Sequence, residues 1–140
     1  MKMLPIAVAL GLSLTLPAQA QSTTELFVGI NTGNTQSQGV ALLLANQAVT
    51  QKFAVRVLLC SEGGLLAIKD KESTAIKPVN KSPKEILQGL IKAGAKVEVC
   101  AIFLPNSDWK AADLIDGVGV AKPAEVAAYL LQPNVKTLTY

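Results

Sequence analysis

The sequence contains no histidine, and this absence removes several kinds of active site. A chain without histidine has no serine–histidine or cysteine–histidine triad, no HExxH zinc site and no histidine general base. We accordingly predict neither a metal site nor a cofactor. Any chemistry has to come from other side chains, and the two cysteines, Cys60 and Cys100, become the first candidates.

Aromatic residues are also scarce, with three phenylalanines, two tyrosines and one tryptophan in 140 residues. The formal net charge is only +3, and the lysines are scattered along the chain. Proteins that bind nucleic acids usually combine a basic stripe with rings that stack on bases. Neither feature is present, so nucleic acid is not an expected partner.

Long apolar runs are limited to one, at residues 4–16. It follows Met-Lys-Met and precedes Pro17-Ala18-Gln19-Ala20. A basic start, an apolar stretch and an A-x-A ending are the three parts of a secretory signal, whereas a membrane anchor needs about 20 apolar residues. The sequence predicts a signal peptide over residues 1–20, cleavage after Ala20, a periplasmic protein and no membrane contact after cleavage.

Residues 21–140 have the pattern of one α/β domain, in which short apolar runs alternate with helical stretches. The helix signals are Thr35 with Gln38, a Ser82–Glu85 capping box, an Asp108 cap and Pro123. In the last helix we expect Val126, Ala127, Leu130 and Leu131 to point inward. Strands are predicted at 26–30, 54–59, 97–102, 117–120 and, half-exposed at an edge, 135–140; helices are predicted at 36–52, 82–94 and 109–115 and after Pro123. This order predicts a three-layer α/β/α sandwich with a mainly parallel sheet of about five strands.

Sites in parallel sheets form beyond the carboxyl ends of the strands. The loop Asn31-Thr32-Gly33-Asn34 lies there, between a strand and a helix, and is a weak candidate for ligand binding. It lacks the Gly-Lys-Ser/Thr of a P-loop. The alternative is that its glycine only serves the geometry of the turn.

Cys100 and Cys60 also lie near strand ends, and three interpretations remain open. Cys100 is a reactive thiol at the rim of the sheet, or an inert core cysteine, as its apolar neighbours favour. Alternatively, the two cysteines pair, as often happens in exported domains, provided that their strands are neighbours. Such a bridge closes a loop of about 40 residues, worth about 4 kcal/mol in the chain-entropy model.

The helix that begins at Ser82, the following Ala93-Gly94-Ala95, and the strand that leads to Cys100 resemble the DsrE-like family of sulfur-relay proteins, in particular its small exported members. The first strand with its polar loop, and Asp113-Leu-Ile-Asp-Gly117-Val with the proline-started helix after it, extend the resemblance over most of residues 21–140.

The resemblance implies a persulfide carried on Cys100, a sulfur donor or acceptor protein as partner, and assembly into oligomers. Many exported relatives have a second cysteine three residues further on, where this chain has Phe103, so a C-x-x-C pair is excluded. Trp109 and Tyr129 are candidates for a homo-oligomer interface, although Trp109 fits the core equally well. The competing interpretation is a non-catalytic binding or assembly module with structural cysteines.

Overall fold

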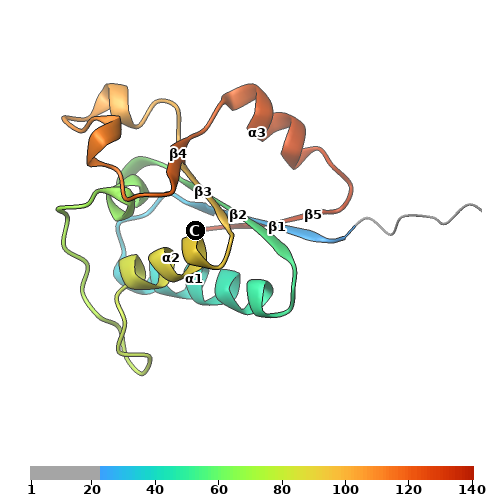
Figure 1. Cartoon of the computed structure of the whole chain (residues 1–140), viewed down its shortest axis with the longest axis horizontal. Coiled ribbons are helices and arrows are strands. Elements are labelled where there is room, and N and C mark those ends of the chain that lie inside the picture. The colour runs from blue at the N-terminus through green and yellow to red at the C-terminus, as the bar shows by residue number, and fades with distance from the viewer. Residues whose placement is uncertain (1–22) are drawn as a thin grey trace, which may run out of the picture.

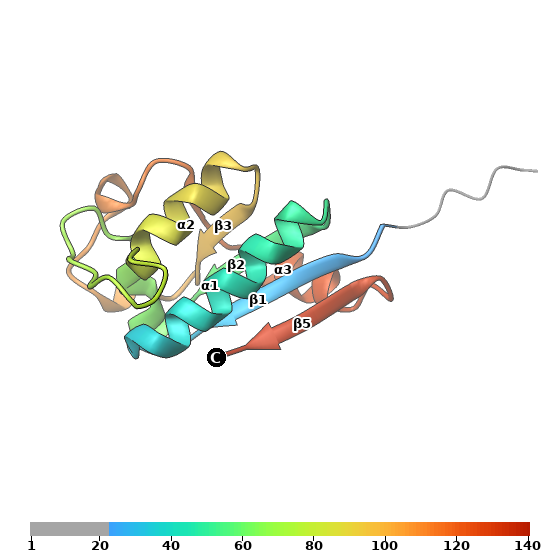
Figure 2. The same cartoon turned by 90° about the horizontal axis from the view of Figure 1, so that it is seen from below.

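A computed structural model describes residues 23–140, so the predicted signal peptide lies outside the described residues. Five parallel strands form one sheet in the order β4-β3-β2-β1-β5. Helices α1 and α2 cover one face and α3 lies on the other, which confirms the predicted three-layer sandwich (Figure 1, Figure 2). The elements are β1 Glu25–Ile30, α1 Thr35–Thr50, β2 Ala54–Leu59, η1 Ser61–Ala67, α2 Pro83–Lys92, β3 Lys96–Val99, η2 Leu104–Asn106, η3 Ala111–Asp113, β4 Val118–Val120, α3 Pro123–Leu130 and β5 Val135–Thr139.

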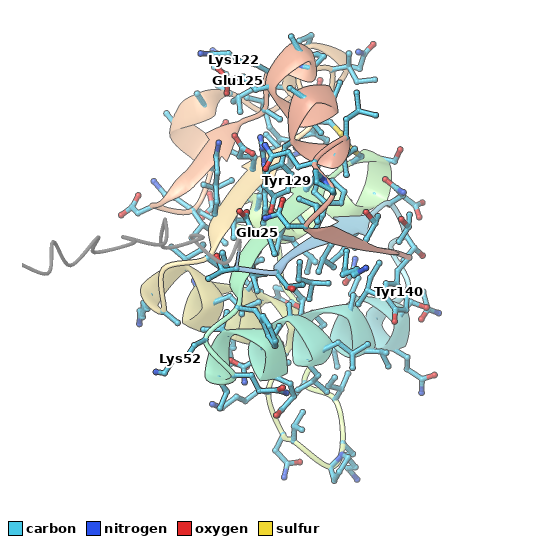
Figure 3. The ribbon with its side chains drawn as sticks, turned by 90° about the vertical axis from the view of Figure 1, so that its right-hand side faces the viewer. Glu25, Lys52, Lys122, Glu125, Tyr129 and Tyr140 are labelled. Atoms are coloured by element: carbon cyan, nitrogen blue, oxygen red, sulfur yellow. A yellow bond between two sulfur atoms is a disulfide. The ribbon has the colours of Figure 1, made fainter. Side chains whose placement is uncertain are left out.

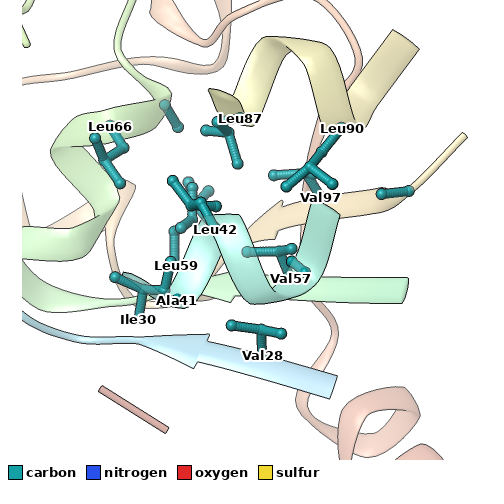
Figure 4. Close-up of a cluster of buried hydrophobic side chains, with 14 of the residues drawn as sticks. Val28, Ile30, Ala41, Leu42, Val57, Leu59, Leu66, Leu87, Leu90 and Val97 are labelled. Atoms are coloured by element: carbon teal, nitrogen blue, oxygen red, sulfur yellow. The ribbon is translucent and has the colours of Figure 1, made fainter. Parts of the chain in front are cut away.

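The main core lies between the sheet and the α1–α2 layer (Figure 4). Alternate residues of a strand point to the same face. β1 and β3 each give two buried β-branched side chains to this core, and β2 gives three buried side chains, Val55, Val57 and Leu59. α2 contributes an apolar stripe at helical spacing. The side chains that are completely buried include Val28, Ile30, Leu42, Val57, Leu59, Leu87, Leu90 and Val99.

Two of the four predicted helix starts, those at Ser82 and Pro123, agree with the structure, and two differ. Ser82 forms the predicted capping box with Glu85, at 2.7 Å and 3.2 Å between the reciprocal donors and acceptors. Asn34 rather than Thr35 caps α1, because its side-chain oxygen accepts a 3.0 Å hydrogen bond from the Ser37 amide. The expected helix over 109–115 is only the 3₁₀ turn η3, and Asp108 does not cap it.

The prediction for the last helix was partly wrong. Val126 is buried, but Ala127, Leu130 and Leu131 are exposed, with Leu131 at 85 %. The physical reason is the small size of this layer, since α3 has eight residues and faces a five-stranded sheet by itself. Val126 meets Phe27 and Ala121 of the sheet side, while the next turn of the helix projects past them. An apolar surface therefore remains open on the α3 face.

Candidate functional site

The pairing of β2 with β3 brings the two cysteines together. Leu58 is opposite Glu98 and Leu59 opposite Val99, so paired residues differ by 40 in number. Cys60 and Cys100 follow directly and are also 40 residues apart. The amide of Cys100 donates to the carbonyl of Leu59 at 2.9 Å, which continues the ladder to this point. The structure joins the two cysteines in a disulfide, with their Cα atoms 5.1 Å apart.

Strand alternation places this disulfide on the α3 face of the sheet. Leu58, two residues before Cys60, packs against the small cluster beneath α3. Glu98, two residues before Cys100, binds Arg56, whose guanidinium lies 5.0 Å from the ring centroid of Tyr129 on α3. Both cysteines are half-buried. The disulfide therefore lies at the carboxyl edge of the sheet, next to the layer that α3 forms alone (Figure 1).

A pocket of about 360 Å³ opens on this face beside Cys100. Leu58 contributes to it from the sheet, Ala101 and Ile102 from the turn after β3, and Ala127 and Leu130 from α3. Ile102 is 72 % exposed. None of the described residues that line the pocket is charged or has a polar side chain other than the cysteine.

The nearest charges on this face form a cluster of ion pairs around Glu98. Nε and Nη2 of Arg56 lie 2.8 Å and 2.7 Å from one carboxylate oxygen of Glu98, and Lys96 lies 3.2 Å from the other. The side chains of Arg56 and Glu98 are each only 7 % exposed. A buried pair of opposite charge gives little net field at its neighbours. Sequence reasoning missed this pair. The available signal was strand alternation, because Glu98 is two residues before Cys100 and Arg56 is four residues before Cys60, so both share a sheet face with the cysteines.

The loop 31–34 lies at the same edge of the sheet, and several of its polar groups are bonded within the chain. The Gly33 amide donates to the Glu62 carboxylate at 3.1 Å, and the Gln38 side chain donates to the Thr32 carbonyl at 2.8 Å. A pocket of about 180 Å³ adjoins Gly33 and Glu62. Ligand binding by Asn31, Thr32, Gly33 and Asn34 stays a prediction, and the Glu62 carboxylate favours a hydrogen-bond-donating or cationic ligand over a phosphate.

Lys84 and Tyr129 are two partly buried groups with shifted pKa values, and both side chains are engaged in hydrogen bonds. Burial lowers the pKa of Lys84, but its amino group donates to the carbonyls of Ile68, Lys69 and Lys71 and so holds a loop in place. Burial, followed by a hydrogen bond to Glu25, raises the pKa of Tyr129. Figure 3 shows Tyr129, near the end of α3, beside Glu25 of β1.

Three further observations bear on the remaining predictions. Within residues 23–140, no helix is long and apolar enough to cross a bilayer. The same part of the chain contains no group of three or more side chains that would hold a metal ion. The two predicted interface residues are both half-buried: Trp109 packs against the main core, and Tyr129 lies over Arg56 and beside Phe27. Homo-oligomer formation therefore stays a prediction.

Comparison with known proteins places the fold but not the activity. No model of a known protein family matches the chain, and no curated protein matches it. Among solved structures, the YchN protein of E. coli is 18 % identical, with a TM-score of 0.67 over 84 % of this chain and 100 % of that one. MTH1491 of Methanobacterium thermoautotrophicum, described as a protein of unknown function, is 15 % identical, with a TM-score of 0.64 over 84 % of this chain and 99 % of its own. The chain thus has the DsrE-like fold that these two structures share.

Proposed function

We propose that this protein is a periplasmic sulfur carrier that holds sulfane sulfur as a persulfide on Cys100. The observation that supports the proposal best is the position of Cys100, half-buried at the carboxyl edge of the sheet with an open pocket on one side and Cys60 on the other. A carrier needs a thiol that a donor can reach and that water does not surround. The disulfide is then the oxidised form of the carrier.

The cycle begins when a protein dithiol reduces the bridge and is itself oxidised to a disulfide. The Cys100 thiolate then attacks the outer sulfur of a donor persulfide, R–S–SH. The S–S bond of the donor breaks, R–S⁻ leaves, and Cys100–S–SH forms. Transfer to an acceptor thiolate repeats the same exchange in the opposite direction. If no acceptor arrives, the Cys60 thiolate attacks Sγ of Cys100, which restores the bridge and expels HS⁻.

This proximity of Cys60 gives the test. The Cys60→Ser variant has no second thiol, so a persulfide on Cys100 has no internal route to sulfide and should accumulate. The reduced variant is treated with cysteine persulfide and its intact mass is measured. We expect an increase of about 32 Da, one sulfur atom, on the peptide that contains Cys100, removable by a phosphine reductant. The wild-type protein should instead release sulfide and end about 2 Da below its reduced mass.

The matched control is Cys100→Ser, in which Cys60 is the only thiol. Sulfur uptake by Cys100→Ser equal to that of Cys60→Ser would show that either thiol simply reacts with persulfides, and the proposed role of Cys100 would be abandoned. Absence of uptake by Cys60→Ser would contradict the carrier directly. The location is tested on the same sample: the protein recovered from the periplasm should begin at Gln21.

A second candidate is a binding or assembly module in which the bridge is purely structural. The exposed apolar side chains of the α3 face favour it, since Ile102, Leu130 and Leu131 project from a surface that one short helix covers. A second copy of the chain is the proposed partner. Sedimentation velocity should then show a concentration-dependent oligomer that Leu131→Lys dissociates and that the remote exposed substitution Phe53→Lys leaves intact. A monomer at all concentrations would remove this candidate.

A further inference from the structure

The pocket beside Cys100 has a chemical character that the carrier proposal does not use. Its lining includes Leu58 of the sheet, Ile102 of the turn after β3, and Val126, Ala127 and Leu130 of α3. Its volume, about 360 Å³, is at the lower end of the range of small-molecule pockets. Among the described residues that line the pocket, Cys100 is the single one with a sulfur atom, so a molecule held in the pocket lies beside this residue.

We infer that this pocket selects the molecule that exchanges sulfur with Cys100, and that it takes small organic persulfides and thiols whose substituent is uncharged and apolar. The inference rests on the proposed carrier function and specifies its substrate class. The donor R–S–SH places its apolar substituent R among the side chains of α3 and its outer sulfur at Cys100. The exchange is the one given above: Cys100 gains the outer sulfur, and R–S⁻ leaves.

A charged substituent is disfavoured by what surrounds it. Moving a carboxylate or an ammonium group from water to an apolar wall is costly unless a counter-charge or hydrogen bonds compensate it. The charges of the first turn of α3 are already paired, with Lys122 Nζ 3.0 Å from the Glu125 carboxylate (Figure 3). Arg56 and Glu98 are likewise bound to each other beneath the helix. None of these four residues lines the pocket.

An apolar substituent gains from the same walls. Each methylene that leaves water for an apolar contact favours binding by a factor of about three to four, so a three-carbon chain that is partly covered favours the loaded complex about tenfold. The volume accommodates such a chain with the two sulfur atoms. Long acyl chains and peptides exceed it, and therefore a small molecule rather than a macromolecule is the proposed occupant.

The experiment compares two persulfides on the reduced Cys60→Ser variant: n-propyl persulfide and the persulfide of 3-mercaptopropionate. The two have chains of equal length and differ in one carboxylate. The rates of sulfur uptake are measured by intact mass. Each rate is divided by the rate at which the same persulfide transfers sulfur to N-acetylcysteine, a thiol without a pocket. We expect this normalised rate to be about tenfold higher for the propyl compound.

A pair of neighbouring helix variants tests whether the pocket causes the preference. Ala127 lines the pocket and is exposed at the helix surface, so Ala127→Lys brings a charge into it without a change in the core. Ala128 is exposed on the same helix and does not line the pocket. In the Cys60→Ser background, Ala127→Lys should remove the preference for the propyl compound, while Ala128→Lys should keep it.

The outcomes separate this inference from the carrier function. Equal normalised rates for the two persulfides, or an equal effect of both lysine variants, would overturn the inference and leave the carrier intact. No uptake of either persulfide would overturn both. Uptake that falls as the protein assembles at higher concentration would mean that a second copy fills the pocket, which also overturns the inference.

Discussion

Reduction of the Cys60–Cys100 bridge should weaken the fold by a defined amount and leave it folded. The bridge closes a loop of 40 residues. In the chain-entropy model a loop of this length stabilises the native state by about 4 kcal/mol, because it restricts the unfolded chain. Domains of this size have unfolding free energies of about 5–15 kcal/mol, so the reduced protein should stay native. The hydrogen bond from the Cys100 amide to the Leu59 carbonyl, 2.9 Å long, does not depend on the bridge.

Urea titrations of the oxidised and the phosphine-reduced protein, followed by far-ultraviolet circular dichroism, measure this difference. The reduced protein should also give the steeper dependence on urea, because an unbridged unfolded chain exposes more surface. The double variant Cys60→Ala/Cys100→Ala is the control and should behave like the reduced wild-type protein both with and without the phosphine.

Two results would refute the reasoning in different ways. A difference below about 1 kcal/mol would mean that the unfolded chain is not restricted as the loop length requires. Loss of the native state on reduction would mean that the bridge is a structural staple. The thiol cycle proposed above would then have no folded starting point, and the assembly module would be the better interpretation.

Three further predictions concern the scaffold. Hydrogen bonds to Ser82 hold the pKa of Glu85 below 4.5, so the contribution of this carboxylate to stability is complete above pH 4.5 and is lost as the pH falls through the lower pKa of the folded state. In urea titrations at about pH 5 and pH 3, Glu85→Gln should lose less stability on acidification than the wild-type protein. An unchanged loss of stability would contradict the capping box. Gly64→Ala forces a methyl group against the buried ring of Phe103 and should lower the stability by about 1–3 kcal/mol. Gly89→Ala places its methyl group with no atom within 4 Å and should raise the stability by about 0.5–1 kcal/mol. Equal effects of the two variants in thermal melts would refute this description of the packing. Glu98→Gln leaves the guanidinium of Arg56 buried without its counter-charge and should cost about 3–5 kcal/mol in the same urea assay; a cost near zero would show that water reaches the pair.

Much of the fold was predictable because local signals and tertiary packing agree in this chain. The Ser82–Glu85 box is a local hydrogen-bond pattern, and it forms as predicted. Buried parallel strands are nearly continuous apolar runs, so β1, β2 and β3 were visible in the sequence. Leu131 shows where this reasoning fails. An apolar residue at helical spacing becomes buried only if another part of the protein packs against it. No sequence pattern states how much of the sheet a helix covers.

The candidate site was predictable in its residues but not in its arrangement. The positions of Cys60 and Cys100 at strand ends follow from the apolar runs before them. Their contact depends on β2 and β3 being neighbours, and strand order is set by the whole topology rather than by a local motif. The apolar pocket was missed for the same reason, because Leu58 and Ala127 are far apart in the sequence and meet only when α3 folds over the sheet.

The link between the ends of β2 and β3 also determines how far this molecule can be stretched. The bridged loop contains η1, α2 and β3. A force applied to the two ends of the chain is carried across the disulfide and does not extend this loop. With about 3.5 Å per extended residue, about 140 Å of chain stays hidden from the pull until the bridge is reduced. The contour length of the unfolded protein therefore depends on the redox state of the two sulfur atoms, and single-molecule force measurements can detect the difference.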